Sequence, residues 1–130
     1  MVNPKLAVAL TGRSGEALEE YKKLMLKLNN EVVAAAPEDL LINTHVCRGN
    51  YHSTFFSSGA YDSVADLLFG EENVNAYYLE YDDERSGGFA PLAKVSGDKK
   101  VVLGLVTTKT PALENKELVI NRIHEAICFS

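Results

Sequence analysis

Apolar residues recur at helical spacing in three stretches of the chain. Between Arg13 and Ala36 they fall three or four positions apart while charged residues occupy the opposite face, which predicts an amphipathic helix that ends before Pro37. A shorter helix is predicted over 61–69 with Gly70 as its C-terminal cap, and a last helix over 116–128.

Three short apolar runs between these helices predict strands. They cover 40–46, 75–81 and 101–106. These runs are too apolar for strands with one wet face, so we expect a parallel sheet buried on both faces. Strands and helices alternate along the chain, which favours an α/β fold in which helices cover the sheet.

Length and composition indicate one domain spanning 1–130, because a chain of 130 residues with 46% hydrophobic content can bury a core. The formal charge of −5 is spread without long runs of one sign, which argues against a nucleic-acid partner. No apolar stretch reaches the roughly 20 residues needed to cross a bilayer, and the N-terminus lacks a signal-peptide pattern. We therefore expect a cytoplasmic protein without a membrane partner, in which Cys47 and Cys128 are not paired.

Reactive side chains follow all three predicted strands. In parallel α/β folds functional groups gather at the carboxyl ends of the strands. His45 and Cys47 end the first strand, Glu80 and Arg85 lie at and after the end of the second, and Lys109 follows the third. This edge of the sheet is therefore where we expect a functional site.

His45 and Cys47 form a candidate zinc site. Residues two positions apart on an extended strand point to the same side, and imidazole with thiolate is a ligand pair that zinc prefers. A catalytic zinc usually takes about three protein ligands and keeps a position for substrate, which makes Glu80 the candidate third ligand. Spacing alone leaves a second interpretation open, in which Cys47 is a buried small side chain and His45 is merely hydrogen-bonded.

Arg85 and Lys109 are the candidate substrate-binding residues, because a cation at a strand end can hold an anionic group of a substrate. Their alternative interpretation is a solvated loop with local ion pairs around Arg85 and a surface lysine at position 109. No residue is assigned to acid–base or nucleophilic catalysis.

Three motifs in order resemble the catalytic barrel of cobalamin-independent methionine synthase, and in particular its short single-barrel relatives. They are Thr-His-Val-Cys-Arg-Gly-Asn-Tyr-His-Ser-Thr at 44–54, Leu-Glu-Tyr-Asp-Asp-Glu-Arg-Ser-Gly at 79–87 and Val-Leu-Gly-Leu-Val-Thr-Thr-Lys at 102–109. The resemblance implies parallel βα units that form part of a (β/α)8 TIM-type barrel. Three strands make only an arc of such a barrel, so we expect either an open sheet or sheet edges that pair with a second copy.

The resemblance also implies a zinc-dependent methyl transfer to a thiol. In that family a His and a Cys from one strand end, a Cys from a later one and in some states a Glu hold the zinc, which implies His45, Cys47 and Glu80 here. Zinc binds homocysteine as its thiolate, and the sulfur takes the methyl group of 5-methyltetrahydrofolate or 5-methyltetrahydropteroyltriglutamate to give methionine.

Two departures from the family pattern bear on activity. The family's later cysteine belongs to a Cys-Gly motif beyond the last predicted helix, and Cys128 lies inside that helix, so it is not the substitute. The upstream barrel segment, which supplies acidic residues for the amino group of homocysteine, has no counterpart in this sequence. We expect a methyltransferase whose activity is impaired or depends on a partner, with a non-catalytic metal-binding or assembly module as the alternative.

Overall fold

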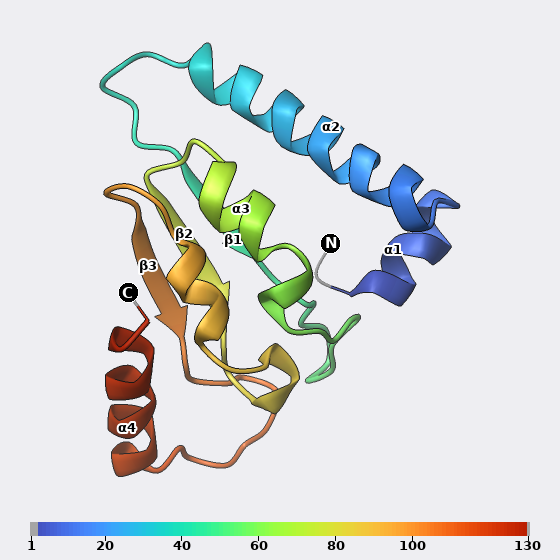
Figure 1. Cartoon of the computed structure of the whole chain (residues 1–130). Coiled ribbons are helices and arrows are strands. Elements are labelled where there is room, and N and C mark those ends of the chain that lie inside the picture. The colour runs from blue at the N-terminus through green and yellow to red at the C-terminus, as the bar shows by residue number, and fades with distance from the viewer. Residues whose placement is uncertain (1–2, 130) are drawn as a thin grey trace.

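A computed structural model describes residues 3–129 and shows a mixed α/β fold around one parallel sheet. The sheet has the order β1-β2-β3, with β1 at Asn43–Val46, β2 at Ala76–Glu80 and β3 at Lys100–Gly104. Both neighbouring pairs are parallel, and Figure 1 shows β2 between its two partners. The predicted α/β class and parallel pairing are confirmed.

The helices agree with the periodic stretches, with one addition at the N-terminus. They are α1 Pro4–Thr11, α2 Gly15–Ala34, α3 Ala65–Glu71 and α4 Lys116–Ile127, with 3₁₀ turns η1 Tyr61–Ser63, η2 Glu84–Ser86 and η3 Ala90–Lys94. The additional helix α1 begins at a cap, since the Asn3 side chain accepts a hydrogen bond from the Leu6 amide and Pro4 occupies the first helical position. In residues 3–129 no helix has the length and apolarity to cross a membrane.

Gly70 is not the cap of α3, which corrects the sequence-based prediction. The helix continues through Gly70 to Glu71. Its last carbonyl oxygens are bound from outside the helix, because Ser96 donates to the carbonyl of Gly70 at 2.7 Å and Lys99 donates to that of Phe69 at 3.1 Å. These partners satisfy the free carbonyls of the helix end, so no glycine turn is needed there.

The core lies on one face of the sheet. Tyr77 and Leu79 of β2 are buried there and belong to one apolar cluster with Phe69 of α3, Leu92 of η3 and Ala126 of α4. Figure 1 shows α3 and the short helical turn of residues 90–94 lying over one face of the sheet. Strands and helices thus pack as two layers.

The other face of the sheet is open. His45, Tyr78 and Val102 stand in one row across the three strands, and all are exposed, Tyr78 to 45% and Val102 to 43%. The expectation of strands buried on both faces is therefore wrong for this chain. The reason is that the helices that contribute to the core pack on the Tyr77 and Leu79 side, where alternate strand residues point.

A candidate metal site at the carboxyl edge of the sheet

The three candidate ligands line one cavity. It has a volume of about 330 Å³ at the carboxyl edge of the sheet and is lined by His45, Cys47, Glu80 and Lys109. Tyr78 and Val102 of the open face form part of its wall. The parallel register brings these residues together, because Glu80 stands beside Gly104 at one end of the β2–β3 ladder and Val46 beside Leu79 at the same end of β1–β2.

His45 and Cys47 present their side chains to solvent. The Nδ1 atom of His45 lies 3.1 Å from the carbonyl oxygen of Tyr78, and a proton on Nδ1 would be donated there and leave Nε2 as the acceptor. The Cys47 sulfur accepts a hydrogen bond from the Gly49 amide at 3.2 Å, and the thiol is free and exposed. The interpretation of Cys47 as a buried packing residue is therefore wrong.

Glu80 holds its carboxylate in a largely buried position, with 10% of the side chain exposed. One oxygen, Oε2, accepts a hydrogen bond from the Arg48 amide at 3.0 Å. The other, Oε1, is buried and has no hydrogen-bond partner within residues 3–129; Arg85 Nη2 and Lys109 Nζ lie 3.6 and 3.7 Å away. Oε1 therefore has two cations within ion-pair distance but no hydrogen bond, an uncommon state for a buried carboxylate oxygen.

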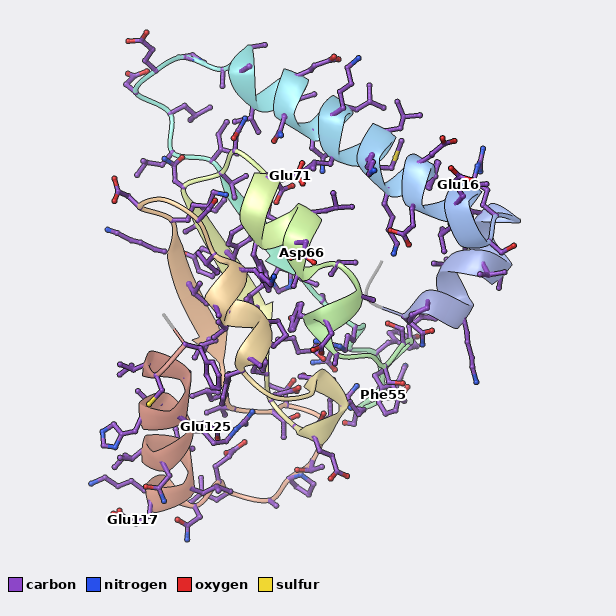
Figure 2. The ribbon with its side chains drawn as sticks, in the orientation of Figure 1. Glu16, Phe55, Asp66, Glu71, Glu117 and Glu125 are labelled. Atoms are coloured by element: carbon purple, nitrogen blue, oxygen red, sulfur yellow. The ribbon has the colours of Figure 1, made fainter. Side chains whose placement is uncertain are left out.

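The two candidate substrate-binding cations are paired with carboxylates of the loop after β2. Lys109 Nζ donates to Asp82 Oδ2 at 2.7 Å, and Arg85 Nε donates to Asp83 Oδ2 at 2.6 Å. The Arg85 guanidinium also stacks on Phe55 at 3.9 Å from the ring centroid, and Figure 2 shows Phe55 beside the turn that carries Arg85. The local ion pairs expected around Arg85 are therefore present, but both cations are about nine-tenths buried, so neither is a solvated surface residue.

Asp82 shows the electrostatic balance at this edge. Burial raises the pKa of Asp82, but hydrogen bonds from Lys109 and Thr107 and the positive charges of Lys109 and Arg85 outweigh it. The resulting pKa lies below the ordinary aspartate value, so Asp82 is a carboxylate at neutral pH and holds Lys109 in place.

The donor types fit zinc, although the side chains do not meet at one point. His45, Cys47 and Glu80 line the same cavity and supply an imidazole nitrogen, a sulfur and a carboxylate, which are the ligand types of zinc. Across the described residues, however, no group of three or more His, Cys, Asp or Glu side chains lies at metal-binding distance. Cys128 does not line this cavity: it lies just after α4, as the C-cap residue and not inside the helix as predicted, and its thiol donates to the carbonyl oxygen of His124 at 3.4 Å.

Arg48 is the residue at this edge that sequence reasoning missed. It follows Cys47 and is only 1% exposed, although its neighbours from Asn50 to Phe56 are exposed. Its position inside the first motif was visible in the sequence, but its burial was not, because an arginine in a glycine-containing loop ordinarily indicates a surface residue.

Comparison with known proteins gives close relatives of greater length. The chain is 45% identical over 113 residues to the uncharacterized protein YxjG of Bacillus subtilis (strain 168), and 46% identical over 112 residues to the uncharacterized protein YxjH of the same organism. These matches cover 86% and 85% of this chain but 30% of each relative, so the chain spans less than a third of their length. No family model and no solved structure matches the chain.

Proposed function

We propose that this chain carries the zinc-binding part of a thiol methyltransferase of the cobalamin-independent methionine synthase type. One structural observation carries the proposal. His45, Cys47 and Glu80 line a single cavity at the carboxyl edge of a parallel sheet, and a buried oxygen of Glu80 in that cavity lacks a hydrogen-bond partner within residues 3–129. The three ordered motifs and their resemblance to that enzyme family support the same function.

Each candidate residue has a separate task in this proposal. His45 through Nε2, Cys47 through its sulfur and Glu80 through its carboxylate would hold the ion. Zinc at such a site lowers the pKa of a bound thiol, which keeps homocysteine or a similar substrate as the nucleophilic thiolate. Lys109 and Arg85 bind an anionic group of the thiol substrate or of the methylfolate donor, in competition with Asp82 and Asp83.

The site is incomplete without further chain. Within residues 3–129 each outer strand, β1 and β3, has an unpaired outer edge, and one face of the sheet is uncovered. We propose that the sheet is part of a (β/α)8 barrel, completed by a second copy or by a segment such as the relatives' additional length supplies. We place this assembly in the cytoplasm, where a reducing environment keeps Cys47 a free thiol.

Metal content and mass test the proposal together. The purified protein is passed over a sizing column with light scattering, and zinc is measured in each fraction by elemental analysis. We expect near-stoichiometric zinc in a dimer, followed by methyl transfer from 5-methyltetrahydrofolate to homocysteine in the zinc-loaded fraction. Metal-free protein after incubation with zinc would contradict the proposal.

A second candidate function is a non-catalytic metal-binding or assembly module. The observation in its favour is that the three-stranded sheet of residues 3–129 has unpaired outer edges and one uncovered face, which suit assembly with another chain. The two functions separate in one assay: protein that retains zinc but transfers no methyl group when zinc, homocysteine and donor are all supplied would be the module.

A further inference from the structure

Arg48 makes an unusually complete set of hydrogen bonds for a loop residue. Its Nε and Nη2 atoms donate to the carbonyl oxygen of Gly59 at 3.0 and 2.6 Å. Its Nη1 donates to the hydroxyl of Tyr61 at 3.2 Å and to the carbonyl oxygen of Glu80 at 2.9 Å. The guanidinium also lies over the Tyr61 ring, 4.5 Å from its centroid.

The partners of this buried guanidinium are neutral groups. Burying a cation costs several kcal/mol unless hydrogen bonds compensate for the lost water, and packing alone is served as well by an apolar side chain. Two carbonyl groups and one phenol supply that compensation for Arg48. A cation kept at this cost joins three chain segments, those of Arg48, Gly59 and Glu80.

Arg48 holds Glu80 at both ends. The guanidinium binds the backbone carbonyl of Glu80, and the backbone amide of Arg48 binds the carboxylate oxygen Oε2. Because that amide belongs to the peptide bond that Cys47 and Arg48 share, the Glu80 carboxylate is tied directly to the backbone of the cysteine. Tyr61 reinforces the link by donating its hydroxyl to the same Glu80 carbonyl at 3.0 Å.

We propose that Arg48 is the positioning residue of the metal site: it fixes the Glu80 carboxylate beside Cys47, with Oε2 hydrogen-bonded and Oε1 without a hydrogen bond. This inference rests on the proposed zinc site. Lysine cannot replace Arg48, because an ammonium lacks the planar fork that reaches Gly59, Tyr61 and Glu80 together. Arg48 acts through Glu80 and does not itself touch the ion.

A double-mutant cycle on zinc affinity tests the inference. The dissociation constant for zinc is measured by competition with a chromophoric chelator for the wild type, Arg48→Lys, Glu80→Gln and the double variant. We expect each single change to weaken zinc binding on the order of 10- to 100-fold, as losses around metal ligands do. The double variant should bind zinc no more than about twofold more weakly than whichever single variant binds it less tightly, because Arg48 acts only through the carboxylate that Glu80→Gln removes.

Cobalt replacing zinc gives a second readout that simple destabilisation would not produce. In Arg48→Lys the charge-transfer absorption from the Cys47 thiolate to cobalt should persist, while the d–d bands change as they do in Glu80→Gln. The matched control is Arg122→Lys, whose guanidinium stacks on Phe89 at 5.3 Å in the helix α4. It should leave zinc affinity and the cobalt spectrum unchanged.

A second variant covers the case in which Arg48→Lys does not fold, because it keeps the buried aromatic ring at position 61. If Arg48→Lys does not fold, Tyr61→Phe takes its place in the cycle, because it removes only the hydroxyl that links Arg48 to the Glu80 carbonyl. Wild-type affinity in the folded variant, or losses that multiply with those of Glu80→Gln, would overturn the role of Arg48 and leave the zinc site standing. Wild-type protein that binds no zinc would overturn both proposals.

Discussion

Lys109 Nζ and Asp82 Oδ2 lie 2.7 Å apart in a pair that is almost withdrawn from solvent, with 10% and 5% of the two side chains exposed. The pair ties the loop after β3 to the loop after β2, and therefore two sides of the candidate cavity. Removing one partner leaves the other charge buried without compensation, which is the costly way to break such a pair.

The change Asp82→Asn should lower the free energy of unfolding at pH 7 by about 1–3 kcal/mol. The folded-state pKa of Asp82 lies below its ordinary value, so its contribution to stability is complete above the unfolded-state pKa of about 3.9 and is lost as pH falls through the folded-state value. Urea unfolding at pH 7 and pH 3 measures the free energy of unfolding of both proteins. The difference between wild type and variant should be smaller at pH 3, and a larger difference there would contradict the assignment of the pair.

The two cysteines give a matched test of the metal ligands. Both thiols are exposed, but only Cys47 lines the cavity. We expect Cys47→Ser to abolish zinc retained through a sizing column and Cys128→Ser to leave it unchanged, measured by elemental analysis. Equal losses in the two variants would show that zinc binds thiols without using this site.

The turn at Gly87 should tolerate no side chain. Its φ of +73° disfavours other residues, and an added Cβ would meet the Ala60 Cβ at 2.5 Å. We expect Gly87→Ala to lower the free energy of unfolding by more than about 2 kcal/mol, since backbone strain and a steric clash add together.

Gly97→Ala is the control for that change, because Gly97 has a similar φ of +66° with open space around it. Only the backbone term applies there, so its cost should be about 1 kcal/mol. Urea denaturation of the three proteins measures both changes. Equal costs would mean that the contact between positions 87 and 60 relaxes freely.

Adjacent residues of β2 should respond in opposite ways to substitution. Leu79 is buried in the core and Tyr78 lies on the open face. Leu79→Ala should cost about 2–5 kcal/mol of unfolding free energy, whereas Tyr78→Thr should cost less than about 1 kcal/mol in the monomer. On a sizing column, Tyr78→Thr should dissociate any dimer that covers the open face, and a dimer that persists would place its interface elsewhere.

The sequence predicted the helices and strands whose apolar residues recur at regular spacing or form a continuous run. The helix α2 and the parallel strands β1 to β3 lie where apolar spacing placed them, within a few residues. The helix α1 was missed because it has only eight residues and depends on its Asn3 and Pro4 start. Burial of the strands was predicted wrongly, because apolar content shows that a face can be covered but not that the chain at hand covers it.

Part of the candidate site could be predicted from the sequence in the same way. Because functional groups gather at the carboxyl ends of parallel strands, His45, Cys47, Glu80 and Lys109 were expected close together, and they line one cavity. Spacing did not predict that Arg48 is buried, because the four hydrogen bonds of its side chain and its contact with the Tyr61 ring join segments far apart in the chain. The sequence also did not predict that Lys109 pairs with Asp82, whereas ion pairs around Arg85 were one of its two interpretations of that loop.

His45, Tyr78 and Val102 form one row across the sheet, so the side chains that reach the candidate cavity depend on the number of residues in β1. Successive strand residues face opposite sides, so one residue inserted in β1 after its pairing begins would turn the imidazole and the thiol toward Tyr77 and Leu79 and bring apolar side chains to the cavity. The loop of residues 49–58 is not a strand, so its length does not decide which face of the sheet a side chain occupies. Natural variants of this chain should therefore differ in length within that loop and never by a single residue between Asn43 and Cys47.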